Sequence, residues 1–398
     1  MRLTYLVLLG SALAARPFLS EPDTGIEDVL GDTPNGTLAN LTQLVGLPDF
    51  QWAARRYLPP ANYTYYINGV AGEWSARNNL EVYYRYTWRP RQLVDITRIP
   101  DTLQTTFLGY NFSVPFYISP CAKAFDGNKD GELGLVKGAA KNDVLYISSS
   151  YSSLTVEEIF GAAEQNQTMF RQIYLNGNIT YDEALIRRVE KAGAKALIWT
   201  VDSNAGSNRQ RADRYGVGSQ SLFSDKAQLF TWDYYEKLRS LTQLPIALKG
   251  IQSVQTIREA AEHKVPAVIV SNHGGRSLDG APSPLEVLLE IHEESPELVN
   301  QIDIWADGGV RYGGDILKLL ALGAKGVGIG RPFMFGNMYG TDGVDRVIQI
   351  LKKELITDAG NVGIPTLQDI SPDYVSAVTY PLTPAPPPAQ LLVQLVSK

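Results

Sequence analysis

Cysteine is almost absent from this chain of 398 residues, in which Cys121 is the only one. A single thiol cannot form a disulfide within the chain, so the fold has to be stabilised by its hydrophobic core. Hydrophobic residues make up 44% of the chain, which is enough for one large α/β domain with extensions or for two domains.

An excess of basic charge is also missing. The formal net charge is −6, and the charges are mixed without a long block of one sign, which argues against a nucleic-acid partner. No apolar stretch approaches the about 20 residues that a membrane span needs. No cluster of histidines and cysteines suggests a metal site. We therefore expect no nucleic acid, no membrane span and no bound metal.

The N-terminus has the pattern of a secretory signal peptide. Arg2 precedes the apolar run 3–13, and Ala12, Leu13 and Ala14 supply a cleavage site, so we assign residues 1–14 to the signal. Secretion is supported by Asn-x-Ser/Thr sequons, which are glycosylation acceptors in secreted proteins. The sequons begin at Asn35, Asn40, Asn62, Asn111, Asn166 and Asn178. We expect a secreted glycoprotein, from a fungal source.

Eight apolar runs of strand length alternate with helical segments from residue 115 onward. The runs are 115–120, 144–148, 170–175, 196–201, 245–249, 265–270, 302–305 and 326–329. This alternation predicts a parallel sheet, and eight strands are the number that closes a (β/α)8 TIM barrel. A doubly wound sheet is the alternative, but no run is followed by the G-x-G-x-x-G dinucleotide pattern. The sequence therefore predicts the barrel.

Three segments flank the predicted barrel, which we place at residues 107–380. Residues 15–106 comprise a polar leader followed by a helical and aromatic segment, in which Pro59 and Pro60 interrupt a helical pattern over 49–66. After the eighth run, 345–355 is a charged amphipathic helix. Residues 381–398 form a Pro-rich C-terminal tail.

A base and a carboxylate-binding side chain follow the sixth predicted strand. His273 titrates near neutral pH and can accept a proton, and Arg276 can bind a carboxylate through two hydrogen bonds. Gly274 and Gly275 let a ligand approach the backbone closely. A lone histidine in such a turn is more often a satisfied polar residue than a base, so the other strand ends decide the interpretation.

The other predicted strand ends carry groups that suit a phosphorylated, electron-accepting cofactor. Gly-rich turns with Arg311 and Arg331 follow strands seven and eight, where these barrels often bind phosphate. Lys249 ends strand five and would stabilise negative charge at the centre of the barrel. A flavin whose reduced ring is anionic needs such a cation.

The run Ser-Asn-His-Gly-Gly-Arg at 271–276 resembles the active-site signature of the FMN-dependent 2-hydroxy acid oxidases and dehydrogenases, a family that includes glycolate oxidase and L-lactate oxidase. The resemblance extends from about residue 49 to residue 374. Further matches in chain order are Tyr65, 89–91, Gln172 with Tyr174, Thr200 with Asp202, 248–250, 307–311 and 329–332. The resemblance implies a TIM barrel, FMN as cofactor, a small 2-hydroxy acid as substrate and a homo-oligomer, a tetramer in this family.

The resemblance also implies which residues are catalytic. His273 would take the hydroxyl proton while the α-hydrogen leaves for the flavin, either as a hydride or after a carbanion has formed. Asp202 would hold the imidazole and stabilise the imidazolium. Tyr174 would donate a hydrogen bond at the reacting centre.

Substrate and cofactor residues follow in the same way. Tyr65, Tyr174, His273 and Arg276 would bind the substrate together with Arg209, for which Arg211 is a second candidate. The implied FMN-binding residues are Pro120, Cys121, Ala122, Ser148, Gln172, Thr200, Lys249, Ser271, Asp307, Gly308, Gly309, Val310, Arg311, Gly330 and Arg331. Cys121 stands where relatives usually carry Thr or Ile, and we interpret it as a packing residue.

The expected reaction is oxidation of an (S)-2-hydroxy acid to the 2-oxo acid, with oxygen reduced to hydrogen peroxide. Three alternatives remain. The protein could use another electron acceptor or a larger, pathway-specific hydroxy acid. It could be an FMN isomerase on the same barrel, although the predicted carboxylate site speaks against this. It could also be a catalytically inactive relative that is secreted as a binding protein.

Overall fold

A closed barrel of eight parallel strands forms the centre of the computed structural model, which describes residues 24–203, 205–218 and 230–377. The strands are β4 (Phe116–Ile118), β5 (Tyr146–Ser148), β6 (Met169–Ile173), β7 (Leu197–Thr200), β8 (Ile246–Ile251), β9 (Ala267–Val270), β10 (Asp303–Asp307) and β11 (Gly326–Ile329). β11 pairs with β4, so the sheet has no free edge. The predicted (β/α)8 barrel is confirmed, and the doubly wound sheet is wrong.

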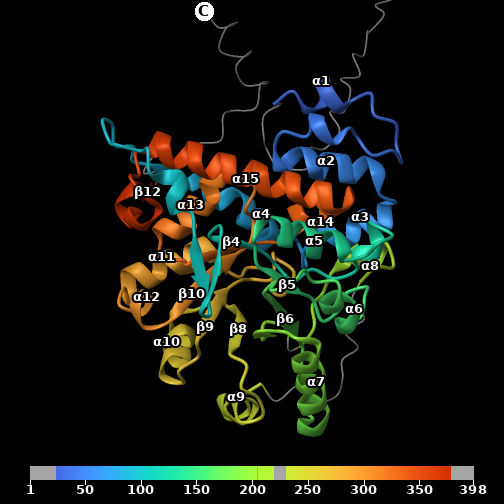
Figure 1. Ribbon diagram of the computed structural model, residues 1–398, viewed down its shortest axis with the longest axis vertical. Helices are drawn as coiled ribbons and strands as arrows, with labels where there is room; N and C mark the ends of the chain where they lie inside the picture. Colours follow the sequence, from blue (N-terminus) through green and yellow to red (C-terminus); the bar gives the residue numbers. More distant parts are fainter. Residues whose placement is uncertain (1–23, 204, 219–229, 378–398) are drawn as a thin grey trace, which may run out of the picture.

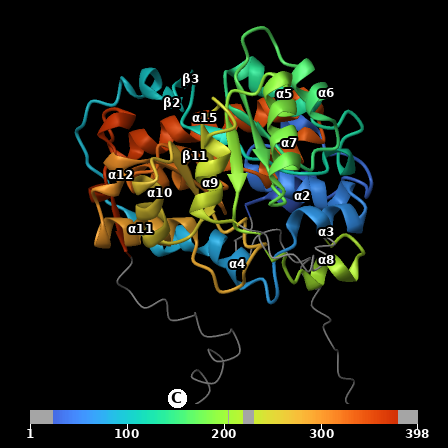
Figure 2. The same cartoon turned by 90° about the horizontal axis from the view of Figure 1, so that it is seen from below.

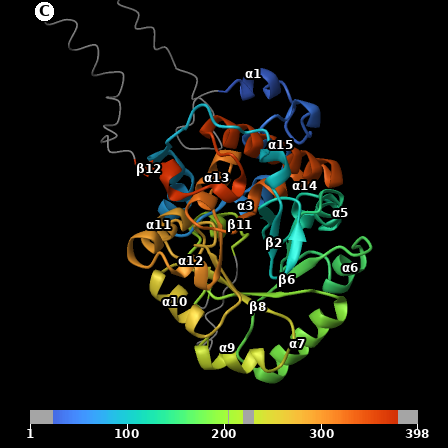
Figure 3. The same cartoon turned by 60° about the vertical axis from the view of Figure 1, so that its left-hand side comes forward.

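Helices surround the barrel, and those before β11 connect its parallel strands (Figure 3). They are α5 (Leu133–Asn142), α6 (Val156–Gly161), α7 (Ile179–Ala192), α9 (Trp232–Arg239), α10 (Val254–Glu262), α11 (Pro284–Glu294), α12 (Leu298–Gln301), α13 (Gly313–Ala321), α14 (Arg331–Asn337) and α15 (Gly340–Val362). Several of them begin at a side chain that accepts a hydrogen bond from the first turn, as helix N-termini require. These N-caps are Thr155, Asn178, Thr231, Ser253 and Ser283.

A short hairpin closes the amino end of the barrel. It consists of β2 (Thr105–Phe107) and β3 (Tyr110–Phe112), which pair antiparallel. Phe107 is fully buried and contacts Tyr117 and Trp305 inside the barrel, with ring centroids 5.7 and 4.9 Å apart. Aromatic and aliphatic side chains therefore fill this end, and a ligand can enter only at the opposite, carboxyl end of the strands.

The N-terminal segment packs on the C-terminal helices and on the rim of the barrel (Figure 1). It contains α1 (Ile26–Leu30), α2 (Leu47–Tyr57), α3 (Pro60–Ile67) and α4 (Trp74–Glu81). The break between α2 and α3 falls at Pro59, as the sequence predicts. The expected polar leader is partly helical in α1. Arg346 of α15 donates a hydrogen bond to the carbonyl of Leu44, which ties this segment to a helix longer than the predicted 345–355.

Short elements complete the described part of the chain. They are η1 (Leu41–Gln43), η2 (Val82–Arg85), β1 (Tyr86–Trp88), η3 (Ile99–Thr102), η4 (Ala124–Asp126), α8 (Gln210–Arg214), η5 (Leu367–Asp369), η6 (Pro372–Tyr374) and β12 (Val375–Ala377). β1 pairs antiparallel with β12 outside the barrel. The predicted domain boundary at residue 107 falls within β2, and the division into domains stays a prediction.

The predicted signal peptide (1–14) and the predicted C-terminal tail (381–398) lie outside the described residues. Among the helices that the structure describes, none has the length and apolar character needed to cross a bilayer.

Gly326 tests how tightly the hairpin closes the barrel. A Cβ at this position would lie 2.1 Å from Cε1 of Phe107, a side chain held by the surrounding rings. We expect Gly326→Ala to lower the free energy of unfolding by about 1–3 kcal/mol, as overpacking of a core usually does. Thermal or denaturant unfolding measures this loss.

Gly161→Ala is the matched control, because a Cβ there would meet nothing within 4 Å. It should change the free energy of unfolding by no more than about 0.5 kcal/mol, or raise it slightly. Equal stability of the two variants would show that the hairpin yields to the added methyl group.

Candidate active site

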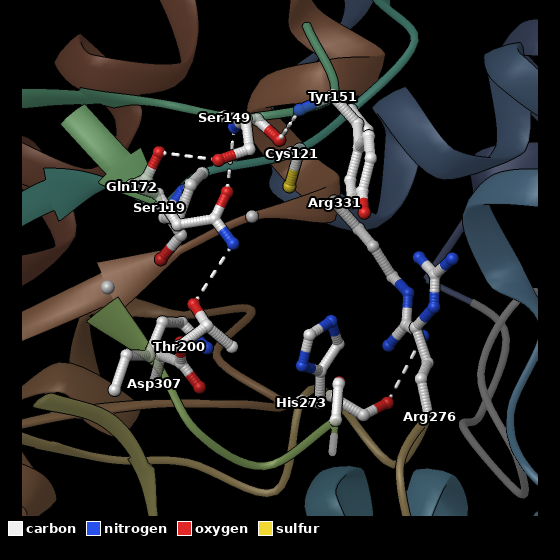
Figure 4. A pocket seen from close by; sticks show the side chains of 18 of the residues that line it. Ser119, Cys121, Ser149, Tyr151, Gln172, Thr200, His273, Arg276, Asp307 and Arg331 are labelled. Atoms are coloured by element: carbon white, nitrogen blue, oxygen red, sulfur yellow. Dashed lines mark hydrogen bonds and ion pairs between the residues drawn. The ribbon is translucent and has the colours of Figure 1, made fainter. Parts of the chain in front are cut away.

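A cavity of about 1330 Å³ opens at the carboxyl ends of the barrel strands. Side chains that follow β4 to β11 line it, together with Tyr65 and Tyr66 of α3. Ligand pockets usually enclose roughly 300–1,000 Å³, so this cavity has room for a cofactor and a substrate side by side. Figure 4 shows His273 and Arg276 pointing into it from one side and Cys121 and Tyr151 from the opposite side.

His273 and Asp202 form a hydrogen-bonded pair at the wall of the cavity. The two residues are 71 positions apart, but Nδ1 of His273 lies 2.8 Å from Oδ1 of Asp202. The Asp202 side chain is fully buried, whereas that of His273 is 21% exposed. The carboxylate therefore binds one ring nitrogen and leaves Nε2 as the nitrogen available to a substrate.

The electrostatics of this pair keep the histidine neutral and the aspartate charged. Burial lowers the pKa of His273, and Asp202 only partly offsets this effect. Burial alone would raise the pKa of Asp202, but His273 and Lys249 outweigh it and lower that pKa. A neutral imidazole whose Nδ1 is bound to a carboxylate can act as a proton acceptor at neutral pH.

Glycine is required beside this pair. Gly250 has φ +100°, and a Cβ there would lie 2.5 Å from Cβ and Cγ of Asp202. His273 itself has φ 60°, a left-handed conformation that non-glycine residues rarely adopt, and it is followed by two left-handed glycines. The backbone thus turns sharply after β9 and directs the imidazole towards the cavity.

Asn272 holds this turn against α4. Its side-chain amide exchanges two hydrogen bonds with that of Asn79, at 2.7 and 2.8 Å, and both residues are buried. It also accepts from the backbone N–H of Gly275. A Cβ on Gly275 would lie 2.3 Å from the backbone nitrogen of Ala76, so α4 contacts the turn directly. This role of Asn272 was not predicted, because its partner Asn79 is 193 residues away in the sequence.

Lys249 is a buried cation at the base of the cavity. Its ammonium lies 3.1 Å from Oδ2 of Asp307 and donates to the hydroxyl of Ser271 at 2.9 Å. Although burial opposes its charge, Asp307 and Asp202 raise the pKa of Lys249, so the side chain is protonated. A buried, hydrogen-bonded cation stabilises negative charge that develops on a bound ligand.

Polar side chains at the ends of β5, β6 and β7 form a connected row. The Gln172 amide donates to the hydroxyl of Thr200 at 3.0 Å and accepts from the backbone N–H of Ser150 at 2.9 Å. Gln172 and Thr200 line the cavity, whereas Ser148 and Ser271 do not. Ser148 instead accepts from Arg171. Ser271 accepts from Lys249. The contacts of these two serines with the cofactor stay a prediction.

Arg209 lines the cavity and Arg211 does not. Nε of Arg209 donates to the carbonyl of Arg276 at 3.0 Å, which brings the two guanidinium groups to the same part of the cavity. Arg211 forms two hydrogen bonds with Glu73 on the outside, at 2.7 and 2.6 Å. The geometry therefore favours Arg209 over Arg211 as the partner of Arg276.

Tyr65 and Tyr174 enter the cavity as the sequence predicts. The Arg276 guanidinium lies 5.3 Å from the ring centroid of Tyr65. Burial, with the nearby Asp202 carboxylate, raises the pKa of Tyr174 to about 12, so its phenol remains a hydrogen-bond donor. Tyr151 packs against Tyr174, with ring centroids 5.2 Å apart. Tyr151 was not among the predicted site residues.

Arg311 and Arg331 lie at the end of the cavity formed by the turns after β10 and β11. Arg331 donates to the backbone carbonyls of Tyr66, Asn68 and Gly274. Burial and the neighbouring Arg276 and Arg311 lower the pKa of Arg331 to about 9. An anion bound here would relieve the repulsion among these cations, and phosphate is the anion that such turns bind.

The remaining predicted FMN-binding residues also line the cavity, namely Pro120, Cys121, Ala122, 307–310 and Gly330. Burial raises the pKa of Cys121, so it is a thiol at neutral pH, consistent with packing. The residues that sequence reasoning missed include Lys123, Ser149, Tyr151, Asn176 and Tyr181. All of them follow a strand of the barrel within eight residues. Their position after a predicted strand was the sequence feature that could have identified them.

The donor set fits FMN. Arg311 and Arg331 suit its phosphate, Gln172 and Thr200 offer the hydrogen bonds that a flavin edge requires, and Lys249 supplies the buried cation. Within the described residues, no group of three or more metal-ligating side chains occurs. Fold and site together define a class, the barrel enzymes that bind a flavin phosphate at the carboxyl ends of their strands.

Comparisons with known proteins identify the family. Residues 54–377 match the model of the FMN-dependent dehydrogenases. The chain is 36% identical over 356 residues to the L-lactate dehydrogenase (cytochrome) of Wickerhamomyces anomalus, a match that covers 84% of this chain and 62% of that protein. It is also 36% identical over 360 residues to a peroxisomal (S)-2-hydroxyacid oxidase of Arabidopsis thaliana, covering 84% and 97%. This chain thus spans less than two thirds of the first relative's length.

Comparisons with solved structures indicate the same family. The flavin-binding domain of baker's yeast flavocytochrome b2 superposes with a TM-score of 0.81 at 34% identity, over 90% of this chain and 93% of that one. A mandelate oxidase with a fluorinated hydroxyphenylpropionic acid gives a TM-score of 0.75 at 32% identity, over 84% and 99%. The protein belongs to the FMN-dependent dehydrogenase family, and FMN is its cofactor.

The two arginines can be separated by substitution. We expect Arg209→Met to lower kcat/KM for a carboxylate substrate by about 10–100-fold, because a hydrogen bond to a charged group contributes about 1.5–3 kcal/mol. The loss should lie mainly in KM. Steady-state kinetics of the FMN-loaded variant measures it.

Arg211→Met is the matched control and should stay within about twofold of the native enzyme, because Arg211 pairs with Glu73 outside the cavity. A larger effect at Arg211 than at Arg209 would reverse the assignment.

Proposed function

We propose that this protein oxidises an (S)-2-hydroxy acid to the corresponding 2-oxo acid. The observation that carries the proposal is the single cavity in which the His273–Asp202 pair, two arginines and a buried lysine meet. This combination supplies a base, a carboxylate-binding site and a cation that stabilises a reduced flavin. The names of relatives, among them (S)-2-hydroxyacid oxidases, support the substrate class.

Each of these side chains has a separate role in the proposed reaction. Arg209 and Arg276 bind the substrate carboxylate, and Tyr65 and Tyr174 donate hydrogen bonds to it or to the hydroxyl. Nε2 of His273 accepts the hydroxyl proton. When bound, FMN supplies a two-electron acceptor for the α-hydrogen and its electron pair.

Asp202 stabilises the imidazolium once His273 has taken the proton. Because the pair is already hydrogen-bonded at 2.8 Å, little reorganisation is needed as charge develops. Lys249, on the neighbouring strand β8, carries a positive charge that Asp307 stabilises. The site is thus prepared for negative charge on the cofactor and positive charge on the histidine.

We propose oxygen as the electron acceptor, with hydrogen peroxide as the second product. The relatives include an oxidase and a dehydrogenase named for cytochrome, so a dehydrogenase with another acceptor is the second candidate. The yield of peroxide per substrate consumed distinguishes the two. A catalytically inactive binding protein is disfavoured by the intact base, arginines and lysine.

We further propose that the protein is secreted and glycosylated, comes from a fungus, and assembles as a homo-oligomer. The signal-like N-terminus and six sequons support secretion. Five of the sequon asparagines, at 35, 40, 111, 166 and 178, have exposed side chains. Asn62 is only partly exposed and donates a hydrogen bond from Nδ2 to the carbonyl of Asp126 at 2.8 Å, which a glycan on that nitrogen would disturb.

His273→Gln is the direct test of the reaction. It should lower the rate of anaerobic flavin reduction by a 2-hydroxy acid about 10²–10⁴-fold, the usual contribution of a general base. The flavin absorbance of the purified variant should persist, because the FMN-binding side chains are unchanged. His263→Gln, outside the cavity, should reduce the flavin at the native rate. Full reductive activity of His273→Gln would refute the mechanism.

The pH profile gives a second readout of the same base. Because the pKa of His273 is lowered, the active neutral form persists below the ordinary histidine range near 6.5. Flavin reduction by the native enzyme should therefore decline only below about pH 6.5, as the imidazole becomes protonated. A decline centred above that pH would contradict this environment.

Secretion and glycosylation are tested by expression in a eukaryotic host. We expect the protein in the medium, with its electrophoretic mobility increased by enzymatic removal of N-glycans. Asn166→Gln should remove one glycan, whereas Asn62→Gln should leave the glycan number unchanged. Retention of an unglycosylated protein inside the cell would overturn the proposed location.

A further inference from the structure

Lys123 is a cation of the cavity for which the proposed reaction has no use. The cations among the described lining residues are Lys123, Arg209, Lys249, Arg276, Arg311 and Arg331. A phosphate requires the last two, a reduced flavin requires Lys249, and one carboxylate requires Arg209 and Arg276. Lys123 therefore offers a positive charge to a further negative group.

Two hydrogen bonds hold the backbone of Lys123 in a left-handed conformation. Lys123 has φ 59°, in the left-handed region that is costly for a non-glycine residue. Its N–H donates to the carbonyl of Tyr151 at 3.2 Å, and its carbonyl accepts from the hydroxyl of Tyr66 at 2.7 Å. These two hydrogen bonds fix the backbone of Lys123, which lines the cavity.

The ammonium group lies close to the site that binds the substrate carboxylate. Nζ of Lys123 is 4.5 Å from the ring centroid of Tyr65, and Cζ of Arg276 is 5.3 Å from the same centroid. Two cations on one aromatic ring lie within reach of one small molecule. Arg276 can bind the carboxylate next to the reacting carbon, and Lys123 can bind a negative group at the far end of the same molecule.

The surroundings of Lys123 suit a polar substrate side chain better than an apolar one. Tyr151, whose phenol enters the cavity in Figure 4, follows β5 together with Ser149, Ser150 and Ser152. Hydroxyl groups thus dominate the wall next to the lysine. Asp126 is the carboxylate whose pKa Lys123 influences, and it does not line the cavity.

We propose that Lys123 is a specificity-determining residue that selects 2-hydroxy acids bearing a second anionic group, the 2-hydroxy dicarboxylic acids. This inference rests on the proposed function and adds the substrate class to it. The far carboxylate pairs with Lys123 while the near one is held by Arg209 and Arg276. Lys123 is exposed, so the attraction is one that salt weakens.

The test compares two substrates of equal chain length on the FMN-loaded enzyme without oxygen. (S)-2-Hydroxyglutarate carries the second carboxylate, and (S)-2-hydroxyvalerate lacks it. The measured quantity is the ratio of their flavin-reduction efficiencies, each taken as the limiting rate divided by the apparent Kd. We expect the native ratio to favour the dicarboxylate and to fall as salt is added.

Lys123→Met should lower this ratio about tenfold, the factor that corresponds to about 1.4 kcal/mol. Lys123→Arg should retain the preference, because it keeps the charge. Lys129→Met is the matched control: it removes the same charge from an exposed residue outside the cavity lining and should leave the ratio unchanged.

The outcomes separate the two proposals. Flavin reduction by both acids with no preference, or an equal loss in the Lys123 and Lys129 variants, would overturn the role of Lys123 and leave the oxidation of 2-hydroxy acids intact. A flavin that no 2-hydroxy acid reduces, L-lactate and glycolate included, would overturn the proposed function itself and this inference with it.

Discussion

Burial of charge at the mouth of the barrel is the constraint on which the rest of the site depends. Lys249, Asp202 and Asp307 are removed from water, and an isolated charge there would be costly. Each is compensated by a partner: Lys249 by Asp307 and Ser271, and Asp202 by His273. The same pairing sets the protonation states that the chemistry needs, a charged lysine beside a neutral histidine.

These partners meet only because of the architecture around them. Parallel strands bring their carboxyl ends to one rim, while the β2–β3 hairpin fills the opposite end with aromatic side chains. The N-terminal helices then complete the rim, since α3 supplies Tyr65 and α4 holds the turn after β9 through Asn79. Figure 2 shows α3, α4 and α8 gathered on one face of the molecule. The site thus belongs to the barrel and the N-terminal segment together.

The cavity also explains how one family can serve different acids. Lys249 lies in β8 and His273 follows β9 directly, whereas the wall around Lys123 and Tyr151 comes from the turns after β4 and β5. Changes in those turns alter the side chain that a substrate can carry without moving the reacting groups. The positive charge of Lys123 lies in one of these turns.

The sequence by itself determined the barrel, because eight buried apolar runs alternate with helices. This alternation is visible in short stretches of sequence. It also indicated His273, Arg276 and Lys249, since polar residues directly after buried strands share one rim. Only the tertiary structure distinguishes Arg209 from Arg211, because the two are two residues apart in the sequence and differ in whether they contact Arg276 or Glu73. It alone revealed the Asn79–Asn272 pair and the cavity position of Lys123, since those contacts join segments that no local pattern relates.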